Sequence, residues 1–199
     1  MTSKKLVIFY CLVLIFSVSI HERVDAQQQK PEETISVTLH SEAENTDHRL
    51  LIQLPKNYGR SVQKYPVIFL FDAQDQSLFS YTSTVIDRLA GTNHIPEAIF
   101  VGIVQNDRSK ELNVEKNGAA SELFLQFIKD DLLTYLNKYY DTDQYYTFIG
   151  HSLGGQFVTH AMTRYPEIFR SVISISGALN YPVNDPEYSF YKRKVLREV

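Results

Sequence analysis

The sequence has very little cysteine, since Cys11 is the only one among 199 residues. Cys11 lies in an apolar N-terminal stretch that we expect to be removed on export. The exported chain would then contain no cysteine. This excludes disulfide bonds and thiol catalysis, so that the stability of the chain must come from the packing of its core.

Neither sign of charge is in large excess. The formal net charge is −3, with 44% hydrophobic and 22% charged residues. A balance so close to neutral gives no electrostatic basis for binding nucleic acid or an anionic membrane surface. The length and the hydrophobic fraction are typical of one globular domain with a core of its own.

The patterns of two common kinds of site are also missing. No cluster of His, Cys, Asp and Glu has the spacing of metal ligands, and no glycine-rich loop suits a phosphate group. We therefore predict no metal and no cofactor. The sequence does not indicate an oligomeric state.

The chain has no apolar run of the length that crosses a membrane. Residues 6–20 are apolar, but a span needs about 20 such residues, so a permanent anchor is the weaker alternative. Lys4 and Lys5 precede this stretch, and Val24-Asp25-Ala26 supplies small residues for a cut before Gln27. We predict a signal peptide over residues 1–26, a disordered leader over 27–33 and a domain over 34–199, exported to the periplasm or the extracellular space.

The hydrophobic pattern predicts an α/β fold. Residues 34–40 and 49–54 alternate and indicate an antiparallel hairpin at a sheet edge. Four short apolar runs then suggest parallel strands buried on both faces; they are residues 67–71, 98–104, 147–149 and 172–175. Residues 78–89 and 119–139 have helical spacing, and residues 187–199 begin a further helix. Strands alternating with helices predict a doubly wound, mostly parallel sheet.

One motif indicates a catalytic residue. Gly150-His151-Ser152-Leu153-Gly154 fits G-x-S-x-G and is followed by Gly155. A strand candidate precedes it, and a helical pattern that Tyr165-Pro166 ends follows it. This is the context of a nucleophile elbow, a sharp turn that projects the serine hydroxyl above the sheet. We expect Gly150 and Gly154 to prevent collisions between strand and helix; a flexible Gly/Ser loop is the alternative.

Several segments, in the same order, resemble the "putative esterase" branch of the α/β-hydrolases, which includes siderophore (enterobactin-type) esterases, feruloyl esterases and S-formylglutathione hydrolase. They are residues 65–73 (YPVIFLFDA), 95–103, 107–112, 127–140, the elbow at 150–155 and 174–179. The resemblance covers residues 35–179 and implies an α/β-hydrolase fold with a serine nucleophile. Two departures are Ala73, where the family has glycine, and Gly177, where proline is usual.

The resemblance also implies a set of site residues. Ser152 would attack an ester carbonyl and form an acyl-enzyme. The N–H groups of Leu153 and of the 72–74 turn would stabilise the oxyanion, with Gln74 the expected donor and Ala73 the fallback. An ordinary turn is the alternative for Gln74. His151 is expected to be structural, with its side chain pointing away from the hydroxyl.

Two further features could contribute to substrate binding. The resemblance implies that Arg108 contacts an anionic or polyhydroxy substrate; a solvated loop arginine is the alternative. The pairs Tyr139-Tyr140 and Tyr145-Tyr146 could line a pocket for an aromatic acyl group, but core packing is the preferred interpretation.

The acid and the histidine that follow the serine in this fold are not evident. His160 is the only histidine after Ser152. It lies about 12 Å along the helix by helical rise, so we expect a surface or packing role. Asp185 and Glu187 come too early for the acid. We therefore expect an N-terminal fragment whose C-terminal part is missing or truncated, with little or no activity in isolation.

The main hypothesis is an exported serine carboxylic-ester hydrolase acting on a small-molecule or glycan ester. A degenerate, non-catalytic binding module is one alternative, and an acyltransferase with the same nucleophile is another. The identity of the ester, and the choice between hydrolysis and acyl transfer, are not fixed by the sequence.

Overall fold

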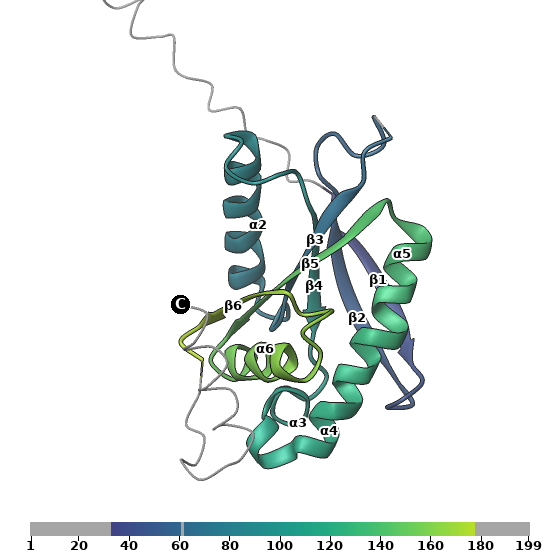
Figure 1. Ribbon diagram of the computed structural model, residues 1–199, viewed down its shortest axis with the longest axis vertical. Coiled ribbons are helices and arrows are strands. Elements are labelled where there is room, and N and C mark those ends of the chain that lie inside the picture. Colours follow the sequence, from purple (N-terminus) through teal and green to yellow (C-terminus); the bar gives the residue numbers. More distant parts are fainter. Residues whose placement is uncertain (1–32, 61, 178–199) are drawn as a thin grey trace, which may run out of the picture. The chain divides into compact units, whose positions relative to one another are not determined.

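The computed structural model describes residues 33–60 and 62–177 (Figure 1). Within them, six strands form one sheet in the order β1-β2-β4-β3-β5-β6. The strands are β1 (Ile35–Ser41), β2 (Thr46–Gln53), β3 (Tyr65–Leu70), β4 (Ile99–Val104), β5 (Thr142–His151) and β6 (Ser171–Ile175). β2 is antiparallel to β1 and β4, and the other neighbours are parallel. The predicted edge hairpin and mostly parallel sheet are confirmed.

Several predictions fall outside the described residues. These are the signal peptide over 1–26, nearly all of the leader over 27–33, and the helix over 187–199. Asp185 and Glu187 lie outside them as well. No helix in the part of the chain that the structure describes is long and apolar enough to cross a membrane.

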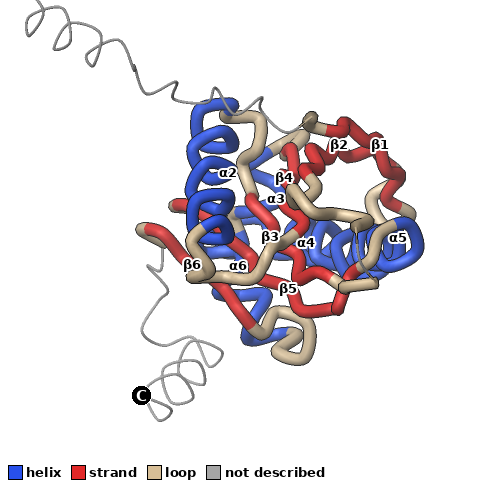
Figure 2. The backbone as a smooth tube through the Cα atoms, turned by 90° about the horizontal axis from the view of Figure 1, so that it is seen from above, coloured by secondary structure: helices blue, strands red, loops and turns tan. Residues whose placement is uncertain are grey.

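Helices lie on both faces of the sheet, as Figures 1 and 2 show for α2 and α5. The helical elements are α2 (Gln76–Gly91), α3 (Arg108–Leu112), α4 (Val114–Gln126), the π-helical η1 (Phe127–Leu132), α5 (Leu133–Tyr139) and α6 (Leu153–Arg164). Phe79 and Ile86 of α2 pack against one face of the sheet. The larger core, on the other face, joins α4, η1, α5 and α6 to the central strands.

β4 is buried along its whole length, and a glycine within it decides how closely its neighbours approach. A Cβ atom at Gly102 would lie 2.7 Å from both the Ala73 Cβ and a ring carbon of Phe79. Gly102 therefore makes room for the ring of Phe79 and for the side chain of Ala73. The Ala73 side chain, where the family has glycine, is accommodated because β4 has no side chain there.

The prediction that all four apolar runs are buried on both faces is wrong for β6. Ile173 and Ile175 are 47% and 45% exposed. β6 pairs with β5 on one side and has no neighbour on its other side among the described residues. A continuous apolar run predicts the strand correctly, but burial of the strand also requires elements that cover its faces and its edge.

The helix predicted over residues 119–139 begins earlier than expected. Asn113 caps α4 by accepting a hydrogen bond from the Lys116 N–H, so the helix starts at Val114. Asn117 then has non-helical angles, which places a kink in the first turns. The sequence pattern missed this start because an apolar stripe marks the buried face of a helix, whereas Val114 is the only apolar residue in the first turn here.

Candidate active site

Ser152 lies in a sharp turn between β5 and α6. Its φ is 55° and its ψ is −112°, outside the helical and extended regions. Such a conformation costs a non-glycine residue roughly 1–3 kcal/mol and persists only where the surroundings hold it. Here the Ser152 N–H donates to the Ile175 carbonyl (3.0 Å), and the Ser152 carbonyl accepts from the Gln156 N–H (3.0 Å). Both neighbours, β6 and α6, therefore hold the turn.

Glycine is needed at two positions around this turn, and only one of them was predicted. A Cβ atom at Gly150 would lie 2.2 Å from the backbone carbon and oxygen of Gly154. At Gly155 it would lie 2.8 Å from the Gly177 Cα and the Ser174 Oγ. A Cβ atom at Gly154 would make only ordinary contacts, the nearest at 3.5 Å to Asp72 Oδ2. The prediction of a collision at Gly154 is thus wrong, because the crowded position is Gly155, one residue further along α6.

His151 is the last residue of β5, and its side chain is exposed. Its backbone carbonyl accepts a hydrogen bond from Arg108 Nη2 at 3.3 Å. His160 lies in the second half of α6 and is half-buried. Its position on the far half of the helix is the one expected from the sequence.

The turn after β3 leads to the same edge of the sheet as the elbow. Most of its backbone N–H groups are already used. The Phe71 N–H donates to the Ile149 carbonyl, the Ala73 N–H to the Ile103 carbonyl, and the Asp75 N–H to the Asp72 carbonyl. The Ala73 N–H, the fallback oxyanion donor, is therefore committed to the sheet. No partner for the Gln74 N–H occurs among the described residues.

Asp72 is the centre of a polar network in this turn. Its φ of 64° is in the left-handed region. Its buried N–H donates to Gln105 Oε1 at 2.6 Å. Its carboxylate accepts from Arg108 Nε at 2.7 Å, from Arg108 Nη2 at 3.0 Å and from Gln74 Nε2 at 3.1 Å. The network connects the turn that carries Gln74 to the strand end that carries Ser152.

Arg108 is therefore placed beside the elbow, at the carboxyl edge of the sheet. Its two-pronged pairing with Asp72 excludes the alternative of a free, solvated loop arginine. Its side chain remains 37% exposed. Contact with a substrate stays a prediction, while positioning of the Asp72 turn is the role that its observed contacts define.

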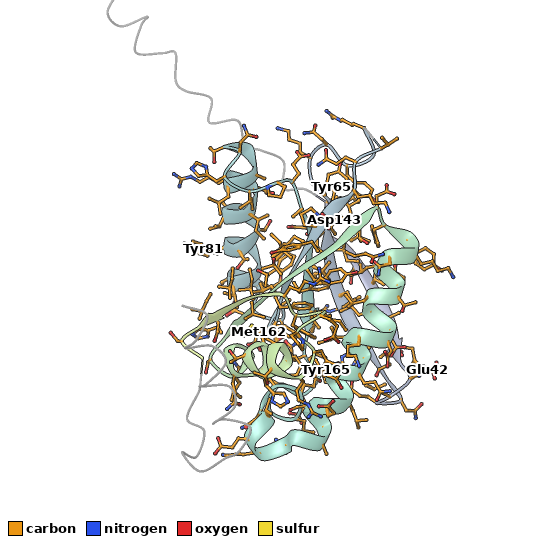
Figure 3. All side chains as sticks on the ribbon, viewed as in Figure 1. Glu42, Tyr65, Tyr81, Asp143, Met162 and Tyr165 are labelled. Carbon is orange, nitrogen blue, oxygen red and sulfur yellow. The ribbon has the colours of Figure 1, made fainter. Side chains whose placement is uncertain are left out.

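The tyrosine pairs do not lie near Ser152. Tyr145 belongs to the start of β5, seven residues before Ser152, which corresponds to about 23 Å of extended strand. Figure 3 shows Tyr65 and Asp143, at the starts of β3 and β5, at the other end of the sheet from Met162 on α6. Tyr146 packs in the larger core, whereas Tyr139 and Tyr145 are exposed. Tyr145 and Tyr146 are therefore too far along β5 to line an acyl pocket at Ser152.

Two buried polar residues near this edge were not predicted from the sequence. Gln105 follows the last residue of β4 and is 7% exposed. Glu111 is 4% exposed, and its Oε1 accepts from the N–H groups of Asn106 and Asp107, each at 2.9 Å. Burial raises the pKa of Glu111 to about 7. A polar residue directly after an apolar strand was the only available signal for Gln105.

No group of three or more metal-binding side chains occurs in the described ranges, 33–60 and 62–177. Among the described residues, this edge of the sheet brings together the Ser152 turn, the turn after β3 and the Arg108–Asp72 ion pair.

Comparison with known proteins identifies the family. The sequence profile described as "Putative esterase" matches residues 41–193. The chain belongs to this family.

Two curated relatives match most of the chain. The chain is 29% identical over 171 residues to the ferri-bacillibactin esterase BesA of Bacillus subtilis (strain 168), covering 71% of this chain and 57% of BesA. It is 24% identical over 154 residues to the uncharacterized protein YbbA of the same organism, covering 71% and 61%. The chain thus spans roughly three fifths of the length of these curated relatives.

Among solved structures, an IroE-like serine hydrolase from Shewanella oneidensis superposes with a TM-score of 0.71 and 24% identity. The match covers 83% of this chain and 57% of the hydrolase. At this identity the likeness establishes the α/β-hydrolase fold of the esterase family for the chain, and the roles of individual residues must be argued from their geometry.

Proposed function

We propose that the chain is the nucleophile-bearing part of an exported serine carboxylic-ester hydrolase. The observation that carries this proposal is the conformation of Ser152. A serine held at φ 55° between a parallel strand and a helix, with Gly150 in close contact with the Gly154 backbone, has the features of a nucleophile elbow. Family membership and the name of the serine hydrolase from Shewanella oneidensis support the same reading.

In the proposed reaction, Ser152 Oγ attacks the carbonyl carbon of an ester, and its proton passes to a base. The tetrahedral intermediate collapses, the base returns the proton to the departing alcohol, and an acyl-enzyme remains. Water then attacks the acyl carbon, and the carboxylic acid and free Ser152 are released. An acyltransferase would differ only in the acceptor of the second step.

Two backbone donors are proposed for the oxyanion. Leu153 is the first residue of α6, where N–H groups have no acceptor within the helix. The Gln74 N–H is the unpaired donor of the turn that Asp72 anchors, within the described residues. Losing one such donor typically costs about 3–4 kcal/mol of transition-state stabilisation.

The proposal also requires a general base that accepts the proton of Ser152 and an acid that orients this base. In α/β-hydrolases the acid and then the histidine follow the serine. We place both in a further segment of the natural gene product, and the greater length of BesA and YbbA supports this. Residues 27–199 alone should then retain only the weak catalysis that the oxyanion site and binding provide. The exported protein should be heavier than residues 27–199.

For the substrate we propose a small-molecule ester, with a siderophore ester as the first choice. BesA is named a ferri-bacillibactin esterase, and it is a relative of this chain. The predicted signal peptide would place the reaction outside the cytoplasm.

The test is hydrolysis of a p-nitrophenyl ester and of a catecholate siderophore ester by the natural full-length protein. Ser152→Ala should abolish turnover of both. Ser109→Ala, which changes an exposed serine on α3, is the matched control and should leave turnover unchanged. Ligand binding without turnover by the wild type would favour a binding module, and turnover by Ser152→Ala would contradict the proposed nucleophile.

A further inference from the structure

The polar network at Asp72 raises the question of what holds the Gln74 N–H in place. Asp72 has a φ of 64°, an unfavourable conformation for a residue with a side chain. Its N–H points away from the ladder, because Phe71 donates to β5 and Ala73 donates to β4. A buried N–H needs an acceptor, and in this turn the acceptor comes from a side chain.

Gln105 supplies that acceptor. The Asp72 N–H donates to Gln105 Oε1 at 2.6 Å, and the Gln105 N–H donates to the Gln74 side-chain oxygen at 3.2 Å. One residue thus bonds both ends of the 72–74 turn. Its side chain is buried, and its Nε2 has no partner among the described residues. Burying an amide with an unused donor is costly, so packing alone does not explain a glutamine here.

We propose that Gln105 is a positioning residue that fixes the Asp72–Gln74 turn so that the Gln74 N–H faces the Ser152 elbow. This inference rests on the proposed function, since it assigns a role in the same reaction. Gln105 does not touch the reacting atoms in this account. It acts through Asp72 and Gln74, while Arg108 ties the same carboxylate to the carbonyl of His151.

Removal of the Gln105 acceptor should affect the chemical step more than substrate binding. Gln105→Met keeps the length of the side chain and removes both polar groups. We expect kcat to fall roughly 10- to 100-fold, less than or comparable to the loss of an oxyanion donor, with KM changed by less than about twofold. Gln105→Asn shortens the side chain, so that the amide no longer reaches Asp72, and it should lower kcat in the same way. Gln105→Asn decides the test if the Met variant does not fold.

The matched control is Gln53→Met. Gln53 is a partly buried glutamine at the end of a strand, and its side chain makes two hydrogen bonds, to Thr34 and Ser83. It pairs with Phe100, near the amino end of β4, and therefore lies at the opposite edge of the sheet from Gln105. Gln53→Met should lower thermal stability without changing kcat.

The measurement is kcat and KM of the natural full-length protein, with active sites counted by fluorophosphonate titration. Counting active sites separates a slower site from a smaller folded fraction. If the wild type does not react with the fluorophosphonate, the proposed function fails and the inference with it. If the wild type reacts and both Gln105 variants keep wild-type kcat per titrated site, only the positioning role is overturned.

Discussion

Arg108 and Asp72 form a two-pronged ion pair at the carboxyl edge of the sheet, with Nε 2.7 Å from Oδ1 and Nη2 3.0 Å from Oδ2. The Asp72 side chain is only 9% exposed. The same Arg108 Nη2 donates to the carbonyl of His151, the residue before the candidate nucleophile. One guanidinium group therefore links the Asp72 turn to the Ser152 turn, and the proposed reaction requires these two turns in a fixed relative position.

Arg108→Gln should destabilise the protein, because it leaves a mostly buried carboxylate without its charged partner. We expect a loss of about 2–4 kcal/mol in the free energy of unfolding, measured by urea denaturation. Lys110→Gln is the control, since Lys110 makes an exposed pair with Asp107 at 3.6 Å. That change should cost less than about 0.5 kcal/mol. Equal effects of the two changes would contradict a structural role for the Arg108–Asp72 pair.

Gly150→Ala should be severely destabilising. The added Cβ atom would overlap the Gly154 backbone at 2.2 Å, and backbone atoms at that contact cannot rotate away. A loss of more than about 3 kcal/mol, or failure to fold, is expected. Gly154→Ala should be tolerated far better, since its nearest contact is 3.5 Å. Thermal denaturation of the two variants checks this, and a Gly154→Ala loss as large as that of Gly150→Ala would refute the crowding described for the elbow.

Much of this arrangement follows from sequence pattern. The period of the apolar residues predicted the six strands and the main helices, because burial on one or two faces leaves a regular trace in the chain. G-x-S-x-G predicted a turn between β5 and α6 for Ser152. Gln105 and the collision at Gly155 were not predicted. Both depend on atoms from segments distant in the sequence, such as Asp72 or Gly177, which meet only in the folded structure.

The same reason explains the errors. Residues 172–175 have the apolar run of a buried strand, yet Ile173 and Ile175 are exposed, and no described strand pairs with the outer edge of β6. Arg108 was expected to be either solvated or in contact with substrate. The structure gives it a third role, as the partner of Asp72, that no spacing along the chain could reveal.

Stability should depend on pH through Glu111. Its pKa is raised from the ordinary 4.5 to about 7, chiefly by burial. The charge of Glu44 also raises the pKa, and the nearby His48 lowers it. The folded state thus prefers the neutral carboxyl. The resulting stabilisation is fully present below pH 4.5 and is lost as the pH rises through about 7.

Glu111→Gln should remove this dependence. The free energy of unfolding of the variant minus that of the wild type should increase by up to about 3 kcal/mol as the pH rises from about 5 to about 8. Urea denaturation at both pH values gives the comparison. Glu115→Gln, on the exposed first turn of α4, should show no such gain. A difference between Glu111→Gln and wild type that does not vary with pH would show that Glu111 keeps an ordinary pKa.

Asp75 should contribute to the stability of α2 as its N-cap. Its carboxylate accepts from the N–H groups of Ser77 at 2.9 Å and Leu78 at 3.1 Å. Asp75→Ala should cost about 1 kcal/mol in thermal denaturation, and Asp75→Asn, which retains the capping oxygen, should cost much less. Similar losses for both variants would indicate that the charge, not the cap, is what matters.

The most direct test of the account is covalent modification of the natural full-length protein by a fluorophosphonate, located by mass spectrometry of its peptides. The account predicts one stoichiometric adduct on Ser152, its loss in Ser152→Ala and its retention in Ser109→Ala. An adduct on another serine, or none with a folded and full-length protein, would contradict the claim that Ser152 is the nucleophile of an esterase.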